Sequence, residues 1–291
     1  MPNELTQAER IRVLEQACAL GLAELRLLGG EPLIHLGDTL ELLGKAKTLG
    51  VKRAVVCTSA VERDFDWLMN FKAFYPMAVS AEASIYSRSG EIHDAVTLTK
   101  GSHASLLANS REAVRVGFDL HWNFVWMRVN MSELDPVVAL AAMIGIKRVR
   151  ILRLMLTGRA RENMAALALP LELETQSQSM LDGIRERFPE VDVRHSKPLA
   201  FQFTDKENVR QLTCDAGAGQ LVVEADGAVI PCIGMKRNPH LAIGNVRTHT
   251  LEELLSFSKD LELAKMSRAT HECPAILFNQ KASRLVQLTL N

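Results

Sequence analysis

Short apolar runs alternate with amphipathic stretches along the first two thirds of the chain. The run 53–58 (RAVVCT) has the length and content of a buried strand, whereas 38–49 has helical spacing and precedes Gly50, a common helix-ending residue. The same reasoning predicts strands over 23–28, 53–58, 77–85, 122–129, 147–154 and 191–195 (or 199–203), and helices over 5–20, 38–49, 61–74, 103–116, 135–144 and 173–187. This alternation predicts right-handed βαβ units and an α/β fold with a parallel sheet, open or closed into a barrel.

The pattern changes after about residue 205. The segment QLVVEADGAVIPCIG contains two short extended runs around Ala225-Asp226-Gly227, and Asp-Gly between apolar runs is typical of a β-hairpin. Further on, Thr250 and Glu253 have the spacing of a helix capping box. We therefore expect an α/β domain over residues 1–205 and a small α+β domain over residues 206–291.

Charge and composition narrow the classes of partner. Lys+Arg and Asp+Glu both number 34 in 291 residues, so the formal net charge is zero, which argues against a nucleic-acid or anionic membrane partner. The sequence has no apolar stretch of membrane-spanning length and no signal peptide, so we expect a cytoplasmic protein. Its 5 cysteines are odd in number and widely spaced, which favours thiols or metal ligands over disulfides.

Gly29-Gly30-Glu31-Pro32 follows the first predicted strand. In parallel α/β folds, ligands bind beyond the carboxyl ends of the strands. Glycines let the backbone bend sharply and approach a ligand, and Pro32 biases Glu31 towards an extended conformation. Glu31 would then hold its carboxylate at the rim of the sheet, where it could receive a cationic amine. The alternative is an ordinary strand-to-helix turn that ends in an acid.

The stretch LRLLGGEPLIHLGDTLELLGKAKTLGV resembles the second strand, turn and helix of radical S-adenosylmethionine (SAM) enzymes, in which the Gly-Gly-Glu-Pro turn grips the amino group and methionine end of the cofactor. Val79-Ser80-Ala81-Glu82 resembles the Ser-x-Asp segment of that family, and Asn130 stands where relatives place a polar residue near the cofactor. Thr157-Gly158-Arg159-Ala160 resembles a turn of the subgroup with C-terminal cluster domains. In Cys57-Thr58-Ser59-Ala60 the match to the family is partial.

This resemblance implies a partial (β/α)6 TIM-like barrel that lacks its first strand, with SAM as cofactor. It also implies a set of cofactor-binding residues, namely Gly29, Gly30, Glu31, Pro32, Ser80 and Asn130. For Ser80 and Asn130 the alternative is that they satisfy the hydrogen bonds of strand ends.

The three cysteines on which the family's chemistry depends are not found in this sequence. In the family, Cys-x-x-x-Cys-x-x-Cys follows the first barrel strand and holds the iron–sulfur cluster that cleaves SAM to a 5′-deoxyadenosyl radical. Cys18, on the apolar face of the first helix, and Cys57, at the end of a strand, are interpreted as buried thiols. The Gly-Gly-Glu-Pro turn keeps its form, which favours a truncated or mis-started enzyme over loss of the cluster. We therefore name no catalytic residue.

The C-terminal cysteines suggest a second metal site. A hairpin at Asp226-Gly227 would bring Cys214 and Cys232 together so that both thiolates converge on one metal, and Cys273 could add a third. The segment CDAGAGQLVVEADGAVIPC resembles the start of the SPASM auxiliary-cluster domain, or of its shorter twitch variant, which implies one auxiliary 4Fe–4S cluster. A zinc site with His271 as the fourth ligand and three unliganded thiols are the alternatives.

The sequence is consistent with two functions. The resemblance implies a radical SAM enzyme that modifies a peptide or protein and receives electrons from a flavodoxin or ferredoxin. The alternative is a non-catalytic barrel that docks a peptide or a partner and carries a structural zinc.

Overall fold

The computed structural model describes residues 3–275 except 62–63, 156–157, 170, 197–213, 237–240 and 271–272. The chain forms two compact units. The sheet unit comprises Arg10–Leu152 and Leu169–His195, and the hairpin unit comprises Met1–Glu9, Arg153–Ala168 and Ser196–Asn291. The expected boundary near residue 205 lies outside the described residues. The N-terminal residues and 153–168 group with the C-terminal part of the chain rather than with the sheet.

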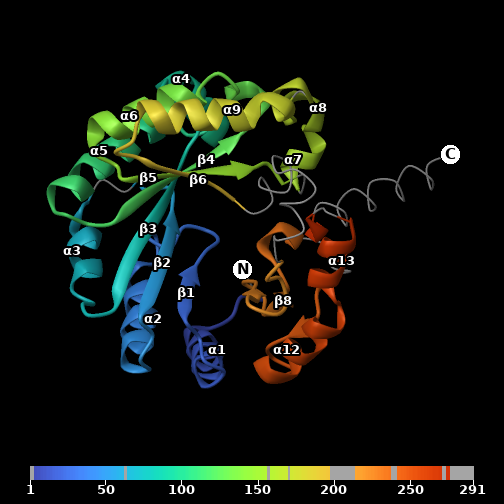
Figure 1. Ribbon diagram of the computed structural model, residues 1–291. Helices are drawn as coiled ribbons and strands as arrows, with labels where there is room; N and C mark the ends of the chain where they lie inside the picture. Colours follow the sequence, from blue (N-terminus) through green and yellow to red (C-terminus); the bar gives the residue numbers. More distant parts are fainter. Residues whose placement is uncertain are drawn as a thin grey trace. The chain divides into compact units, whose positions relative to one another are not determined.

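One sheet of six parallel strands forms the centre of the sheet unit, with the strands in sequence order (Figure 1). The strands are β1 (Glu24–Leu27), β2 (Arg53–Thr58), β3 (Ala78–Ile85), β4 (Leu120–Trp126), β5 (Arg148–Arg153) and β6 (Asp192–His195). The alternation of apolar runs and amphipathic stretches thus predicted the parallel α/β arrangement correctly. The alternative strand at 199–203 lies outside the described residues.

One helix precedes the first strand of this sheet, and further helices connect successive strands. They are α1 (Gln7–Ala19), α2 (Leu36–Thr48), α3 (Asp66–Lys72), α4 (Gly90–Thr97), α5 (Ser102–Arg115), α6 (Leu134–Ile144) and α9 (Leu171–Arg187), with the single 3-10 turn η1 (Arg128–Asn130) after β4. Helix α4 was not predicted, because its 8 residues are too few for helical periodicity to stand out. No helix in the described ranges is long and apolar enough to cross a membrane.

The two faces of the sheet differ in chemistry. Trp122, Phe124 and Trp126 occupy alternate positions of β4, so they point to one face of the sheet, where they are 0%, 0% and 1% exposed. Helices α3, α5 and α9 pack on strands of the sheet, and Figure 1 shows them on its outer side. Residues at the alternate positions, such as Glu82 and His121, point to the opposite, inner face, which is largely polar.

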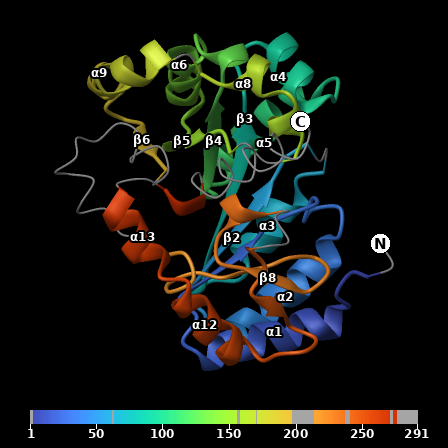
Figure 2. The same cartoon turned by 90° about the vertical axis from the view of Figure 1, so that its right-hand side faces the viewer.

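The hairpin unit contains a small antiparallel sheet and several short helices (Figure 2). Its strands are β7 (Val222–Val223), β8 (Ala228–Ile230) and β9 (Gly244–Asn245), and its helical segments are α7 (Arg159–Glu162), α8 (Met164–Leu167), the 3-10 turn η2 (Ile233–Met235), α12 (Leu251–Asp260) and α13 (Leu263–Thr270). Strands β7 and β8 pair antiparallel, and Gly227 in their turn has φ 87°. The side chains of Thr250 and Glu253 form the expected capping box at the start of α12. Both local predictions are confirmed.

Candidate functional site

The Gly-Gly turn follows β1 in a conformation that favours glycine. Gly29 and Gly30 have φ of 79° and 52°, in the left-handed region that side chains disfavour. A Cβ atom added at Gly30 would meet nothing within 4 Å. Backbone conformation rather than crowding therefore favours glycine here, and the exposed turn leaves open space for a ligand.

The carboxylate of Glu31 joins the carboxyl ends of β1 and β2. Its Oε1 accepts hydrogen bonds from the Thr58 hydroxyl at 2.6 Å and from the Leu33 amide at 3.2 Å. Its Oε2 accepts from the amide and the hydroxyl of Ser59, at 2.6 and 2.5 Å. A carboxylate can accept about four hydrogen bonds, so these four bonds occupy its acceptor positions. The Ser59 hydroxyl is the donor that can rotate away, because Thr58 Oγ1 also accepts from the Ala60 amide.

Ser80 does not lie beside the Gly-Gly turn. It is the third residue of β3 and pairs with Val55, whereas Thr58 pairs with Ala83. Ser80 therefore lies three residue pairs, or about 10 Å, before the edge of the sheet where Glu31 is held.

Asn130 is buried and its side chain binds backbone groups. The strand β4 ends at Trp126, so Asn130 lies in the following turn rather than at the end of the strand. Its Nδ2 donates to the carbonyls of Tyr86 and Val125 at 2.9 and 3.0 Å, and its Oδ1 accepts from the Met127 amide at 2.7 Å. Asn130 thus fixes the loops that follow β3 and β4.

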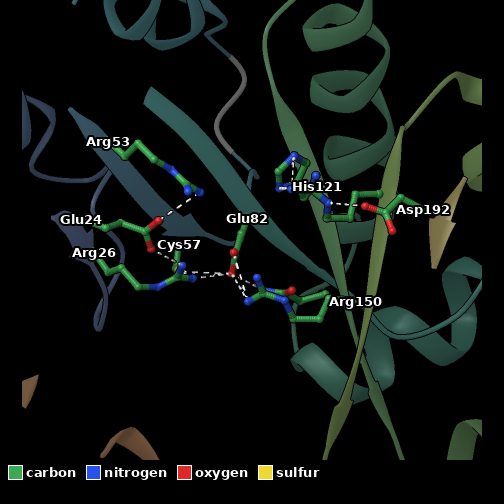
Figure 3. A network of polar contacts seen from close by, with 10 residues as sticks. Glu24, Arg26, Arg53, Cys57, Glu82, His121, Arg150 and Asp192 are labelled. Atoms are coloured by element: carbon green, nitrogen blue, oxygen red, sulfur yellow. Dashed lines mark hydrogen bonds and ion pairs between the residues drawn. The ribbon is translucent and has the colours of Figure 1, made fainter. Parts of the chain in front are cut away.

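Glu82 is the centre of a polar network on the inner face of the sheet (Figure 3). Its side chain is 4% exposed. Oε2 accepts from Arg26 Nη2 at 2.7 Å and from Asn123 Nδ2 at 2.9 Å, and Oε1 lies 3.2 Å from Arg150 Nη1. Burial raises the pKa of Glu82, but the hydrogen bonds from Asn123 and Arg26 and the charges of Arg26 and Arg150 outweigh it and lower the pKa. Glu82 is therefore ionised at neutral pH.

The network continues along the same face. Arg26 also bonds Glu24, which pairs with Arg53, so the connected group contains three guanidinium groups and two carboxylates and carries an excess positive charge. Figure 3 shows a neighbouring group around His121 and Asp192, where Arg148 Nε bonds Asp192 at 2.9 Å and His121 Nε2 lies 2.6 Å from Asp119.

Cys57 belongs to this polar network and is partly rather than fully buried, which differs from the buried thiol expected at the end of this strand. Its Sγ lies 3.8 Å from Glu82 Oε2 and 3.8 Å from Arg26 Nη2. Successive side chains of a strand point to opposite faces of the sheet, which places Cys57 on the inner face. There it pairs with Glu82 of the neighbouring strand β3. Burial and the charge of Glu82 raise the pKa of Cys57 to about 11, which keeps the thiol neutral. Cys18 is also only partly buried, in α1.

Sequence reasoning missed Arg26, Asn123, Arg150 and the role of Glu82. A signal was present, because charged or amide residues alternate with apolar residues in β1, β3, β4 and β5. Such alternation marks a strand with one polar face.

In the hairpin unit, the three cysteines share one apolar cluster. Cys273 is buried there with Met235 and Ala275, and Cys214 and Cys232 pack against the same cluster. All three are free thiols. The Cys232 Sγ accepts a hydrogen bond from the Gly234 amide at 3.4 Å. Burial and the neighbouring Cys273 and Cys214 raise the pKa of Cys232 above its ordinary value.

This donor set suits a metal or cluster that is bound by thiolates, since its three sulfur atoms come from one small region. The described residues contain no group of three His, Cys, Asp or Glu side chains placed to coordinate a metal ion as they stand. A metal or cluster there would be held by these three thiols in their deprotonated form. Gly234 is tightly packed, since a Cβ atom there would lie 2.8 Å from Met155 Cε. His271, the fourth ligand of the zinc alternative, lies outside the described residues.

Comparison with known families identifies the C-terminal part of the chain. Residues 214–274 match the family model of SPASM, described as an iron-sulfur cluster-binding domain. The matched span begins at Cys214 and includes Cys232 and Cys273.

Curated relatives match nearly the whole chain. The PqqA peptide cyclase of Ruegeria pomeroyi is 28% identical over 256 residues, which cover 87% of this chain and 66% of that protein. The PqqA peptide cyclase of Gluconobacter oxydans is 28% identical over 276 residues, covering 93% of this chain and 72% of the relative. The chain thus spans about two thirds of the length of the curated relatives it matches.

Solved structures share the fold. Streptococcus suis SuiB bound to its precursor peptide SuiA has a TM-score of 0.69 at 14% identity, covering 86% of this chain and 58% of SuiB. The anSMEcpe structure with AdoMet and the Cp18Cys peptide has a TM-score of 0.67 at 16% identity, covering 91% and 76% of the two chains. Together with the parallel sheet and the cysteine hairpin, these comparisons support the resemblance of the chain to radical SAM proteins that carry a SPASM domain.

Proposed function

We propose that this chain binds SAM and a peptide substrate and forms part of a peptide-modifying radical SAM enzyme. The observation that carries the proposal is the Glu31 carboxylate, which is held at the carboxyl edge of a parallel sheet beside an open Gly-Gly turn. The relatives named PqqA peptide cyclase and the peptide-bound structures of SuiB and anSMEcpe support a peptide as the substrate.

The residues of this chain would bind the cofactor at the turn. Glu31 would accept a hydrogen bond from the ammonium group of SAM in place of the one from the Ser59 hydroxyl, Pro32 would fix the backbone, and the exposed Gly29 and Gly30 would lie near the methionine end. Ser80 lies deeper on the sheet, where it would contact a bound ligand rather than the turn. Asn130 acts through the backbone of Tyr86 and Val125, which it positions. Bound SAM, cleaved by an electron from an iron–sulfur cluster, would supply the radical that abstracts a hydrogen atom from the substrate.

Cys214, Cys232 and Cys273 would hold the auxiliary 4Fe–4S cluster of the SPASM domain, close to the apolar cluster that contains Met235. The 291 residues contain no Cys-x-x-x-Cys-x-x-Cys, so the ligands of the radical-forming cluster are not among them. The electron donor would be a flavodoxin or ferredoxin, in the cytoplasm.

The decisive test is binding of SAM to the full chain, reconstituted anaerobically with iron and sulfide and measured by calorimetry. We expect saturable binding at one site and about tenfold weaker binding after Glu31→Gln, because the substitution removes a charge-assisted hydrogen bond to the ammonium group. The exposed Glu190→Gln serves as the control and should bind like the unmodified chain.

A second variant separates the role of Glu31 from a structural effect. Ser59→Ala removes a competing donor from the carboxylate and should leave SAM binding as tight or tighter, whereas loss of binding in both Ser59→Ala and Glu31→Gln indicates a collapsed turn. Absence of SAM uptake by a correctly folded, iron-loaded chain would contradict the proposed function.

A further inference from the structure

We propose that Asn123 and Arg150, on the inner face of the sheet, form a subsite that binds one residue of the substrate peptide through its backbone N–H and C=O. The proposal deepens the proposed function, since it rests on a peptide being the substrate. It assigns a binding role to side chains that neither the motif resemblance nor the matched SPASM domain covers.

The first observation is an unpaired acceptor. Asn123 is 9% exposed, and its Oδ1 is buried without a hydrogen-bond partner in the described part of the chain. The amide orientation is fixed, because Nδ2 donates to Glu82 Oε2 at 2.9 Å and a carboxylate can only accept. A buried acceptor without a donor costs about 1–3 kcal/mol, so this oxygen favours a ligand that brings an N–H or O–H group.

The second observation is an unused donor beside it. Arg150 contacts Glu82 through Nη1 alone, at 3.2 and 3.4 Å from the two carboxylate oxygens. Within the described residues its Nε and Nη2 have no partner, and its side chain is 33% exposed. The side chains of Asn123 and Arg150 thus both contact the carboxylate of Glu82. The excess positive charge of the network favours a ligand that offers an oxygen acceptor.

The pair of groups matches an extended peptide residue. In an extended backbone the N–H and C=O of one residue point to the same edge, as they do in a β-bridge. The N–H would donate to Asn123 Oδ1, and the C=O would accept from Arg150. Helices α3, α5 and α9 pack on the opposite face of the sheet, so a ligand would reach this pair from the inner face, on which Figure 3 shows Glu82 and Arg150. A carboxylate supplies no donor for Asn123 and would leave its Oδ1 unpaired.

The test compares three small probes by NMR on the full chain, with the Asn123 side-chain signal assigned by its loss in Asn123→Leu. N-acetyl-L-alanine N-methylamide presents both groups, and O-acetyl-L-lactic acid N-methylamide replaces the central N–H by oxygen. We expect the diamide to shift the Asn123 signal saturably, and the ester to bind about fivefold more weakly, which is the effect of one lost hydrogen bond. Acetate, the third probe, should not saturate the site.

Variants complete the test. Arg150→Met should weaken diamide binding about fivefold, and Arg150→Lys should restore part of it, whereas Arg194→Met, on an exposed arginine paired with Asp192, should change nothing. Equal binding of diamide and ester, saturation by acetate alone, or displacement of the diamide by SAM would overturn the proposal. The result is distinguishable from failure of the proposed function, because the probes bind without SAM and calorimetry measures SAM separately.

Discussion

Glu31 and Asn130 show why similar sequence signals lead to different roles. Both were expected to contact the cofactor. Three of the groups that bond Glu31 are fixed, but the fourth is a hydroxyl that can rotate, so a ligand can replace it. Asn130 donates both amide hydrogens to backbone carbonyls, and a ligand could replace them only by breaking the loop. The distinction depends on partners that are distant in sequence.

The buried side chain of His93 predicts that the folded protein loses stability in acid. It is 2% exposed, its Nδ1 accepts a hydrogen bond from the Tyr86 amide at 3.3 Å, and its ring lies 5.3 Å from that of His103. Burial and the charge of His103 lower the pKa of His93 to about 4, although Asp94 opposes the shift. The unfolded chain binds the proton near pH 6.5, so the stabilisation is complete above that pH and is lost as the pH falls towards 4.

The expected loss of unfolding free energy over this range is about 3 kcal/mol, since one pKa unit is worth about 1.4 kcal/mol. Denaturant unfolding between pH 7 and 4 measures it. His93→Gln keeps an acceptor for the Tyr86 amide but does not titrate, and should remove this part of the pH dependence, leaving that of His103, whose pKa burial also lowers. Exposed His35→Gln should leave the curve unchanged, and an undiminished pH dependence in His93→Gln would refute the assignment.

At the scale of the element, the sequence predicted correctly those structures that depend on interactions between residues close together in the chain. The hairpin formed at Asp226-Gly227 because glycine takes the left-handed φ of 87° that the turn needs, and the capping box formed because Thr250 and Glu253 satisfy each other's amides. Strand β4 began two residues earlier and ended three residues earlier than the predicted 122–129, which moved Asn130 into a turn. Periodicity locates an element well and its ends poorly.

The capping box at the start of α12 is expected to stabilise that helix. Thr250→Ala removes the hydroxyl that accepts from the Glu253 amide at 3.3 Å, and we expect α12 to lose about 1 kcal/mol of local stability. Amide hydrogen exchange in the first turn of α12 measures the change. Ser256→Ala, on the exposed face of the same helix, should alter exchange by less than about 0.5 kcal/mol. Equal effects of the two substitutions would show that the cap contributes nothing.

At the scale of the molecule, the N-terminal segment belongs to the hairpin unit. The Leu5 amide donates to the carbonyl of Ala225 at 2.7 Å, and Arg247 bonds both oxygens of Glu9 as well as the carbonyls of Asn3 and Glu4. The first residues are thus linked to a turn more than two hundred positions away. Propensity and motif spacing carry no information about such a pairing.

Arg247→Met tests this link. Removal of the guanidinium group breaks the bonds to Glu9, Asn3 and Glu4 together, so we expect the Leu5 amide to exchange at least about tenfold faster, measured by hydrogen exchange on the full chain. Arg115→Met, which breaks an exposed pair with Glu112 within α5, should leave exchange at Leu5 unchanged. Unchanged exchange at Leu5 in Arg247→Met would mean that the Ala225 bond alone holds the segment.

The sequence by itself determined the order of strands and helices, the hairpin, the cap and the Gly-Gly turn, because each depends on residues within a few positions of one another. It also placed charged residues at alternate positions in the strands, yet a period of two does not say which face is inward. The register of the parallel strands decided that Arg26, Cys57, Glu82, Asn123 and Arg150 meet. That register follows from packing of the apolar face against the helices, which joins residues more than a hundred positions apart.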